Sequence, residues 1–303
     1  MRPLRIGDRV QLVAASSAIH GPAAAERLLA GCAVLAGWGL QTPDPEWIEK
    51  QLLGRHWGYL AGRDAQRLED LSDETAALLA CVRGGWGAAR LLEHGPALPD
   101  RWLLGFSDVT SLLWAQCAQG RSGAIHGPLV TTLAAEPDWS QERLRQLLFG
   151  EPLPPLRGLG LGGGRSIGRL LVGNLTVATH LIGTRLLPPL KGAVLVLEDV
   201  GEAPYRIDRM LTHWRLSGAL RELAAIGFGR FSDCEDGPEP DAAVEAAAQR
   251  RFGLEQVLQE RTADLGIPVV MDLPVGHVCG NAALPLGALA CLDGDAGSLE
   301  LLS

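Results

Sequence analysis

The sequence predicts an α/β fold built from two domains. In residues 1–150, short apolar runs typical of buried strands alternate with helical patterns, and a similar alternation resumes in residues 169–303. Between them, residues 151–168 (EPLPPLRGLGLGGGRSIG) are dense in proline and glycine and lack a helical or strand period, as in a linker or an extended crossover. A chain of 303 residues is long enough for two domains. Strand and helix in alternation predict parallel strands covered by helices.

The N-terminal domain contains three expected strands, each followed or preceded by a helical pattern. The strands have the sequences RVQLVAA, AALLACV and RWLLGF, and the helices are expected at 22–36, 63–71 and 108–119. In the C-terminal domain, the expected strands are GAVLVLED at 192–199, AAIGFG, IPVVMDL and the closing ALACLDG, with a helix at 206–224 and an Ala/Glu-rich segment at 240–260. Residues 232–251 are acidic and rich in helix breakers at their start, which predicts a surface excursion leading into a helix.

Composition excludes several classes of function. A formal net charge of −8 argues against binding nucleic acid or an anionic membrane, because either needs a basic face, and a small-molecule or peptide substrate fits better. No apolar run approaches the ~20 residues that cross a bilayer, and the start of the chain lacks a signal-peptide core, so we expect a cytoplasmic protein. The dispersed cysteines predict reduced core residues, and no cluster has metal-ligand spacing: Cys32, Cys81, Cys117, Cys234, Cys279 and Cys291.

Ser107 follows the apolar run Trp102-Leu103-Leu104 and precedes a helical pattern, so it lies on a strand-to-helix turn. One interpretation is a helix cap, in which the hydroxyl accepts a hydrogen bond from an N–H two or three residues on. The other is a nucleophile elbow, in which a tight turn exposes Oγ at the carboxyl edge of the sheet and leaves the next N–H free for an oxyanion. The local sequence allows both.

A glycine-rich loop, with Gly84, Gly85 and Gly87, lies between the second strand and a helix. Phosphate-binding loops occur at such places, but neither G-x-x-x-x-G-K-[ST] nor a dinucleotide fingerprint is present, which disfavours a nicotinamide-dependent oxidoreductase. The loop is either a tight turn or a set of backbone N–H groups that can approach a developing negative charge closely. It lies at the same sheet edge as Ser107, so the two can face one crevice.

A serine nucleophile needs a base and an acid that orients the base. His277 stands just past the strand 267–273 in a turn with Pro274 and Gly276, where a side chain can point into a cleft, and His126 after the strand-like AIH is a rival. Glu198 and Asp199 end the strand AVLVLED and could accept a hydrogen bond from an imidazole. Acids also commonly terminate strands, so the local pattern leaves the choice open.

Six segments together resemble the LD-carboxypeptidase family of serine peptidases, which includes muramoyltetrapeptide carboxypeptidases and microcin-C immunity carboxypeptidases. They are VRGGWGAARLL, LLGFSDVT, AIHGP, GNLTVATHLIGT, VLVLEDVGEAPYRIDRML and GIPVVMDLPVGH, and the resemblance extends from about residue 5 to residue 295. It implies a catalytic triad of Ser107, Glu198 and His277, with an oxyanion hole formed by the N–H groups of Asp108 and Gly85. It also implies a flavodoxin-like or amidotransferase-like N-terminal domain, a C-terminal domain with its own sheet, a homodimer, and no metal or other cofactor.

The implied reaction is hydrolysis of the amide bond to a C-terminal D-amino acid in cytoplasmic murein-derived peptides. Trp86 stands where the family usually has tyrosine, and VAASSA at 13–18 lacks a proline often found there, so both differences bear on the substrate. An amidase of the microcin-C immunity type, which cleaves peptidyl- or aminoacyl-nucleotides, is the alternative, since Trp86 offers a stacking face for a base. A non-enzymatic anion-binding or ligand-binding α/β module, with Ser107 as a cap, is the other. Arg83, Arg206 and Arg209 are candidates to hold a substrate carboxylate.

Overall fold

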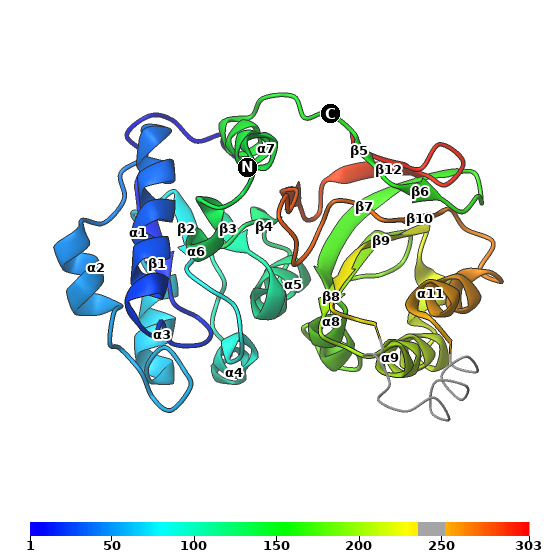
Figure 1. The fold of residues 1–303 in the computed structure, drawn as a ribbon, viewed down its shortest axis with the longest axis horizontal. Helices are drawn as coiled ribbons and strands as arrows, with labels where there is room; N and C mark the ends of the chain where they lie inside the picture. The colour runs from blue at the N-terminus through cyan, green and yellow to red at the C-terminus, as the bar shows by residue number, and fades with distance from the viewer. Residues whose placement is uncertain (236–251, 303) are drawn as a thin grey trace, which may run out of the picture.

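Two β-sheets standing side by side, each covered by helices, make up the computed structural model, which describes residues 1–235 and 252–302 (Figure 1). The mixed α/β class predicted from the sequence is confirmed. Most of the 240–260 segment and of the 232–251 excursion lies outside the described residues. Among the described helices, none combines the length and the apolar character needed to cross a membrane.

The first sheet has five strands in the order β1-β2-β3-β4-β11. Strands β1 to β4 are parallel and β11 is antiparallel to β4. Every residue of β1 to β4 is buried, because helices cover both faces of a parallel sheet. The strands are β1 (Val10–Val13), β2 (Leu78–Cys81), β3 (Trp102–Gly105), β4 (Ala124–His126) and β11 (Leu284–Pro285). The helices of this part are α1 (Pro22–Gly37), α2 (Pro45–Gln51), α3 (Asp64–Leu71), α4 (Ala88–Leu91), α5 (Thr110–Ala118), α6 (Val130–Leu133) and α7 (Asp138–Phe149), with 3-10 turns η1 (Leu92–His94) and η2 (Ser107–Val109).

The second sheet has eight strands in the order β5-β13-β12-β7-β8-β9-β10-β6, and its central strands β7 to β10 are parallel. The strands are β5 (Leu156–Arg157), β6 (Leu159–Gly160), β7 (Arg165–Asn174), β8 (Val194–Val200), β9 (Ala225–Ser232), β10 (Val269–Met271), β12 (Leu289–Asp293) and β13 (Ser298–Leu301). The helices are α8 (Leu175–Leu181), α9 (Pro204–Leu216) and α11 (Leu254–Thr262), with the 3-10 turn η3 (Ala219–Glu222).

The strands and helices expected from the sequence are confirmed, with shifted boundaries. The helix expected at 206–224 ends at Leu216, because Gly218 adopts a left-handed φ of 82° and the chain continues as η3. The helix expected at 108–119 begins with the 3-10 turn η2 before α5.

The connection at 151–168 is more ordered than a linker. It contains β5 and β6 and the start of β7, so its backbone groups pair at the edges of the second sheet. Strand β11 returns from the C-terminal half to the first sheet and pairs with β4. We propose that the chain divides into parts 1–150 and 169–303. Strand β11 belongs to the second part in sequence but pairs with the sheet of the first part. The flavodoxin-like detail is not confirmed, because β1 to β4 lie in sequence order across the sheet.

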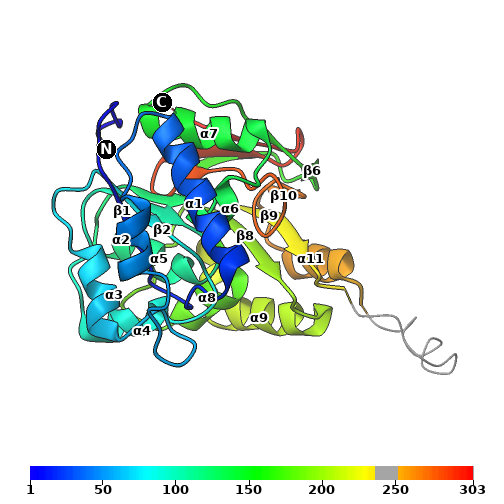
Figure 2. The ribbon, with the colours of Figure 1, turned by 60° about the vertical axis from the view of Figure 1, so that its left-hand side comes forward.

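Helix α5 lies between the two sheets and joins them, whereas α1 crosses the outer face of the first sheet (Figures 1 and 2). Trp114 of α5 donates a hydrogen bond from Nε1 to the carbonyl oxygen of Val172 in β7, at 2.9 Å, and its ring meets that of Trp214 edge-on. One continuous buried apolar cluster includes residues of both sheets. The carboxyl ends of β3 and β8 are therefore held in fixed relation to each other.

Candidate active site

Ser107 occupies a strained turn directly after β3. Its φ is 62°, which is uncommon for a residue other than glycine, and Phe106 before it is extended. Val109, not Ser107, holds the cap position of α5. Oγ of Ser107 lies instead 3.1 Å from Nε2 of His277. A serine forced into a left-handed conformation between strand and helix is typical of a nucleophile elbow.

The glycine loop after β2 passes close to this serine. A Cβ added at Gly84 would lie 2.9 Å from Oγ of Ser107, so only glycine allows the backbone this near. Gly85 has a φ of 108°, and a Cβ there would overlap the side chain of Ser17. The N–H of Gly85 donates to no acceptor among the described residues. The loop thus brings a free backbone donor to the edge of the sheet where Ser107 lies.

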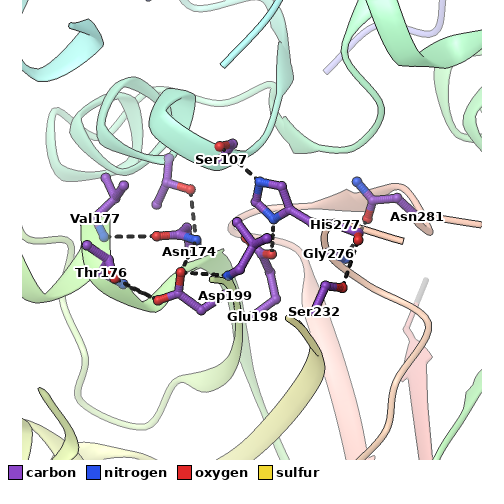
Figure 3. A network of polar contacts seen from close by, with 12 residues as sticks. Ser107, Asn174, Thr176, Val177, Glu198, Asp199, Ser232, Gly276, His277 and Asn281 are labelled. Carbon is purple, nitrogen blue, oxygen red and sulfur yellow. Dashed lines mark hydrogen bonds and ion pairs between the residues drawn. The ribbon is translucent and has the colours of Figure 1, made fainter. Parts of the chain in front are cut away.

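Glu198 and His277 complete a hydrogen-bonded series with Ser107 (Figure 3). Glu198 lies near the end of β8, where a bulge interrupts pairing with β9, and it is fully buried. Its Oε2 lies 2.7 Å from Nδ1 of His277, which stands in the loop after β10. If Nδ1 carries the proton and donates it to Glu198, Nε2 is free to accept from Ser107.

Charge and burial act in opposite directions on this pair. Burial lowers the pKa of His277, but the hydrogen bond and negative charge of Glu198 outweigh it, so the net pKa is above the ordinary value. Burial raises the pKa of Glu198, and the hydrogen bond from His277 opposes that rise. A carboxylate placed in this way stabilises an imidazolium and holds the ring in one orientation.

The two acids that end β8 have different tasks. Successive residues of a strand point to opposite faces, and Asp199 points away from His277. Its Oδ1 accepts a hydrogen bond from Asn174 Nδ2 at 2.9 Å, and its Oδ2 accepts from the backbone N–H and the hydroxyl of Thr176 at the start of α8. The local sequence pattern left the choice between Glu198 and Asp199 open and the family resemblance implied Glu198; in the structure, Glu198 is the acid that contacts the imidazole.

The loop that carries His277 is held by hydrogen bonds to residues in both halves of the molecule. From the first half, Glu136 accepts hydrogen bonds from the N–H groups of Gly280 at 2.7 Å and Asn281 at 3.0 Å. Asn281 Oδ1 accepts from the Gly276 N–H at 2.9 Å. Sequence analysis missed Glu136 and Asn281, because they are 145 positions apart and share no local motif.

Two further contacts within the second half hold the same loop. Ser232 of β9 donates a hydrogen bond to the carbonyl oxygen of His277 at 2.7 Å. Gly276 has a φ of 123°, and a Cβ there would lie 2.8 Å from Oε2 of Glu198. Glycine is therefore required at 276 for the imidazole and the carboxylate to meet.

His126, the rival base, is fully buried at the end of β4. Its ring lies 5.6 Å from the ring of Phe106, and no hydrogen bond joins it to Ser107. Burial lowers the pKa of His126 to about 3, and the charge of His277 acts in the same direction. The structure therefore brings His277 to the serine and keeps His126 behind Phe106 as a neutral core residue.

A pocket of about 370 Å³ opens beside Ser107 and His277. Its lining comes entirely from the first half apart from His277: Ile19, Ala24, Arg27, Arg83, Gly84, Gly85, Phe106, Ser107, Leu129, Thr131, Thr132 and Ala135. Trp86 is next to Gly85 in the sequence but does not line the pocket, and its side chain is 49% exposed. Arg206 and Arg209 lie over the ring of Tyr205 instead. Of the three arginines singled out from the sequence, only Arg83 faces the pocket.

Within residues 1–235 and 252–302, no cluster of three or more histidine, cysteine, aspartate or glutamate side chains is arranged to hold a metal ion.

Two family models match the chain. The LD-carboxypeptidase N-terminal domain matches residues 10–127, and the LD-carboxypeptidase C-terminal domain matches residues 167–292. Ser107 lies in the first match, and Glu198 and His277 lie in the second.

Curated relatives and solved structures agree with these matches. The chain is 46% identical to a Synechocystis protein named as a carboxypeptidase, over 99% of this chain and 96% of the relative. It is 38% identical to a murein tetrapeptide carboxypeptidase of Pseudomonas aeruginosa, over 80% of this chain and 83% of the relative.

Two solved structures share the fold. Muramoyltetrapeptide carboxypeptidase from Oxalobacter formigenes aligns with a TM-score of 0.80 at 24% identity, over 97% of each chain. The microcin C7 self-immunity protein MccF, in complex with aspartyl sulfamoyl adenosine, aligns with a TM-score of 0.81 at 20% identity, over 100% of this chain and 98% of that one. The matches to both domain models and the identity to these relatives show that the chain belongs to the LD-carboxypeptidase family of serine peptidases.

Proposed function

We propose that this serine carboxypeptidase hydrolyses the amide bond to a C-terminal D-amino acid in murein-derived peptides, with Ser107, His277 and Glu198 as its triad. The observation that carries the proposal is the continuous hydrogen-bonded series Ser107 Oγ, His277 Nε2, His277 Nδ1 and Glu198 Oε2, with separations of 3.1 and 2.7 Å. The relative from Pseudomonas aeruginosa, named for murein tetrapeptides, supports this substrate class.

In the proposed reaction, Oγ of Ser107 attacks the carbonyl carbon of the scissile amide while Nε2 of His277 takes the hydroxyl proton. Glu198 stabilises the imidazolium that results. Collapse of the tetrahedral intermediate breaks the C–N bond, and His277 gives its proton to the departing amine of the terminal residue. Water, deprotonated by the same imidazole, then hydrolyses the acyl-serine ester and restores the enzyme.

The N–H groups of Asp108 and Gly85 are the proposed oxyanion donors. Asp108 follows the nucleophile, and Gly85 follows the glycine that packs against Oγ of Ser107. The side chain of Asp108 points away and accepts a hydrogen bond from the Ala88 N–H at 2.8 Å, which ties the serine turn to the start of α4. Each such donor lowers the barrier by roughly 3–4 kcal/mol in comparable sites.

The direct test is incubation with a murein tetrapeptide that ends in D-alanine, beside its all-L isomer, with mass spectrometry of the products. We expect release of the terminal D-alanine only, with a kcat/KM for the all-L peptide at least about 100-fold lower. Equal cleavage of both isomers would contradict the stereochemical part of the proposal, and cleavage of neither would contradict the substrate class.

An amidase acting on aminoacyl-nucleotides is the second candidate. It is favoured by Trp86, whose half-exposed ring next to Gly85 offers a stacking face for a base. The solved structure of MccF holds aspartyl sulfamoyl adenosine. Adding an aminoacyl-sulfamoyl adenylate to the competition above distinguishes the two candidates, because a higher kcat/KM for the adenylate would move the substrate assignment while leaving the triad unchanged.

The proposal also includes a cytoplasmic location and a homodimer, which the sequence and the family resemblance suggested. Peptides released from the cell wall and returned to the cytoplasm would then be the substrate. Cell fractionation tests the location, and light scattering coupled to size-exclusion chromatography tests the dimer. A monomer at all concentrations would contradict the second part.

A further inference from the structure

Two arginines from separate elements line the pocket beside the catalytic serine. Arg27 lies on α1, and Arg83 follows β2 immediately before the glycine loop. Arg83 is half-buried, and its Nη1 donates a hydrogen bond to the carbonyl oxygen of Ala18 at 2.8 Å. That contact uses one of the five N–H donors of the guanidinium, so the others stay available to a ligand in the pocket.

Neither arginine has an acidic partner within residues 1–235 and 252–302. Several other arginines of the chain form ion pairs, for example Arg55 with Asp70, Arg67 with Asp64, and Arg206 with Glu202. The pocket that holds Ser107 therefore contains two positive charges that no carboxylate among the described residues neutralises. In a chain of net charge −8, this local excess of positive charge is opposite in sign to the whole.

We propose that Arg27 and Arg83 bind the α-carboxylate of the residue that the enzyme releases. This inference rests on the proposed function, since only a C-terminal residue carries an α-carboxylate next to the scissile amide. Guanidinium groups bind carboxylates through paired N–H donors, which adds geometric specificity to charge attraction.

The position of Arg83 fits this task. In a terminal residue, the carboxylate is separated from the leaving nitrogen by a single α-carbon, so its binding group must lie close to the nucleophile. Arg83 precedes Gly84, whose α-carbon faces Oγ of Ser107. The same stretch of backbone can thus place the carboxylate anchor and a proposed oxyanion donor on either side of the scissile bond.

The rest of the pocket suits a small terminal side chain. Ile19, Ala24 and Leu129 supply apolar walls, and Thr131 and Thr132 supply hydroxyls. An alanine methyl group would be accommodated among these apolar groups, while the two guanidinium groups hold the carboxylate.

The test compares a D-alanine-terminated tetrapeptide with the same peptide bearing a C-terminal amide, which removes the negative charge and keeps the scissile bond. The wild-type enzyme should cleave the acid with a kcat/KM about 10- to 100-fold above that of the amide. Arg83→Gln and Arg27→Gln should each raise KM for the acid and leave the amide nearly unchanged, so that the preference falls toward one. Arg83→Lys should keep part of the preference for the acid, because lysine retains the positive charge but lacks the planar guanidinium group with its paired donors.

Arg206→Gln is the matched control, because Arg206 pairs with Glu202 away from the pocket, and it should keep the wild-type preference. Thermal unfolding of each variant checks that folding is intact. If both Arg27→Gln and Arg83→Gln kept the wild-type preference for the acid over the amide, the proposal that these arginines bind the carboxylate would be wrong, while the proposed carboxypeptidase activity would stand. A wild-type enzyme that cleaves neither peptide, with no D-alanine released from the acid and no D-alaninamide from the amide, would instead overturn the proposed function, and the role of the two arginines with it.

Discussion

The two halves of the molecule hold their parts of the site by different kinds of contact. In the first half, Ser107 is positioned by its own backbone: it is the first residue of η2, it has a left-handed φ, and it follows the end of the buried strand β3 by two residues. In the second half, His277 lies in a loop, and its position depends on Glu198, Ser232 and the contacts that Glu136 makes from the other half. The nucleophile is thus set locally, whereas the base is set by long-range contacts.

This difference predicts which substitutions affect chemistry alone and which also affect the geometry of the site. A change at Ser107 should remove the reacting atom without moving its neighbours. By contrast, substitution of a residue that holds the loop carrying His277 (residues 274–283) should leave every reacting atom present but shift the imidazole.

Ser107→Ala should lower kcat by about 10⁵-fold or more, because no other group in the site can form the acyl intermediate. The midpoint of thermal unfolding should stay unchanged, because Ser107 does not hold the cap position of α5 and makes no capping hydrogen bond there. A helix-capping serine would behave in the opposite way, with a stability loss of about 1 kcal/mol and full turnover. Steady-state kinetics and a thermal melt on the same preparation distinguish the two.

His277→Ala should be nearly as damaging as the serine change, since triad members act as a unit. His126→Ala is the matched comparison, because it removes the other histidine near Phe106. It should lower stability by opening a cavity in the core while kcat stays within about tenfold of the wild-type value. If His126→Ala were the inactive variant and His277→Ala remained active, the assignment of the base would be wrong.

Glu198→Gln should lower kcat by up to about 10⁴-fold and also move the pH profile. His277 acts as a base only when neutral, so kcat/KM falls as the pH drops through its pKa, which the charge of Glu198 raises. Without that charge, only the smaller effect of Asp199 opposes burial, so the pKa of His277 falls and the acidic limb should move to lower pH.

Asp199→Asn is the control for this shift. It makes the same chemical change one residue along β8, on the side that faces Asn174 and Thr176. It should destabilise the start of α8 and move the acidic limb much less than Glu198→Gln does, because the charge of Asp199 raises the pKa of His277 less than the hydrogen bond and charge of Glu198 do. A limb that moves equally in both variants would indicate a general electrostatic effect and not the hydrogen bond from His277 to Glu198.

Glu136→Gln should have the smallest effect, a fall in kcat of about 10-fold with little change in KM, because a misplaced base slows chemistry more than binding. Both loop N–H groups donate to the same oxygen, Oε2, so a neutral glutamine oxygen can still accept from them more weakly, and the loop should loosen without unfolding. A displaced imidazole also loses contact with Glu198, so the acidic limb should shift to lower pH. Glu142→Gln, on the exposed surface of α7, is the control. Lower thermal stability with an unchanged limb would show that Glu136 has only a structural role.

Part of the order of elements and much of the candidate site could be predicted from the sequence, whereas β7, α2 and α7 were not among the expected elements. The apolar runs at β2, β3 and β8 mark buried strands because their residues are apolar without interruption, and the strand ends mark where side chains emerge. Ser107, Glu198 and His277 each follow or end such a run. The family resemblance then joined them, since no local pattern could say that three residues spread over 170 positions meet.

Local sequence determined where the strands and helices form and which side chains stand at their ends, because these depend on periodicity and turn chemistry within about ten residues. The family resemblance implied Glu198 and His277, and the tertiary structure shows what separates them from Asp199 and His126 and which of the three arginines lines the pocket. Those differences depend on which face of a strand meets the other sheet and on how deeply a ring is buried. Both are properties of tertiary packing, in which contacts such as that of Trp114 with Val172 join segments that no local pattern relates.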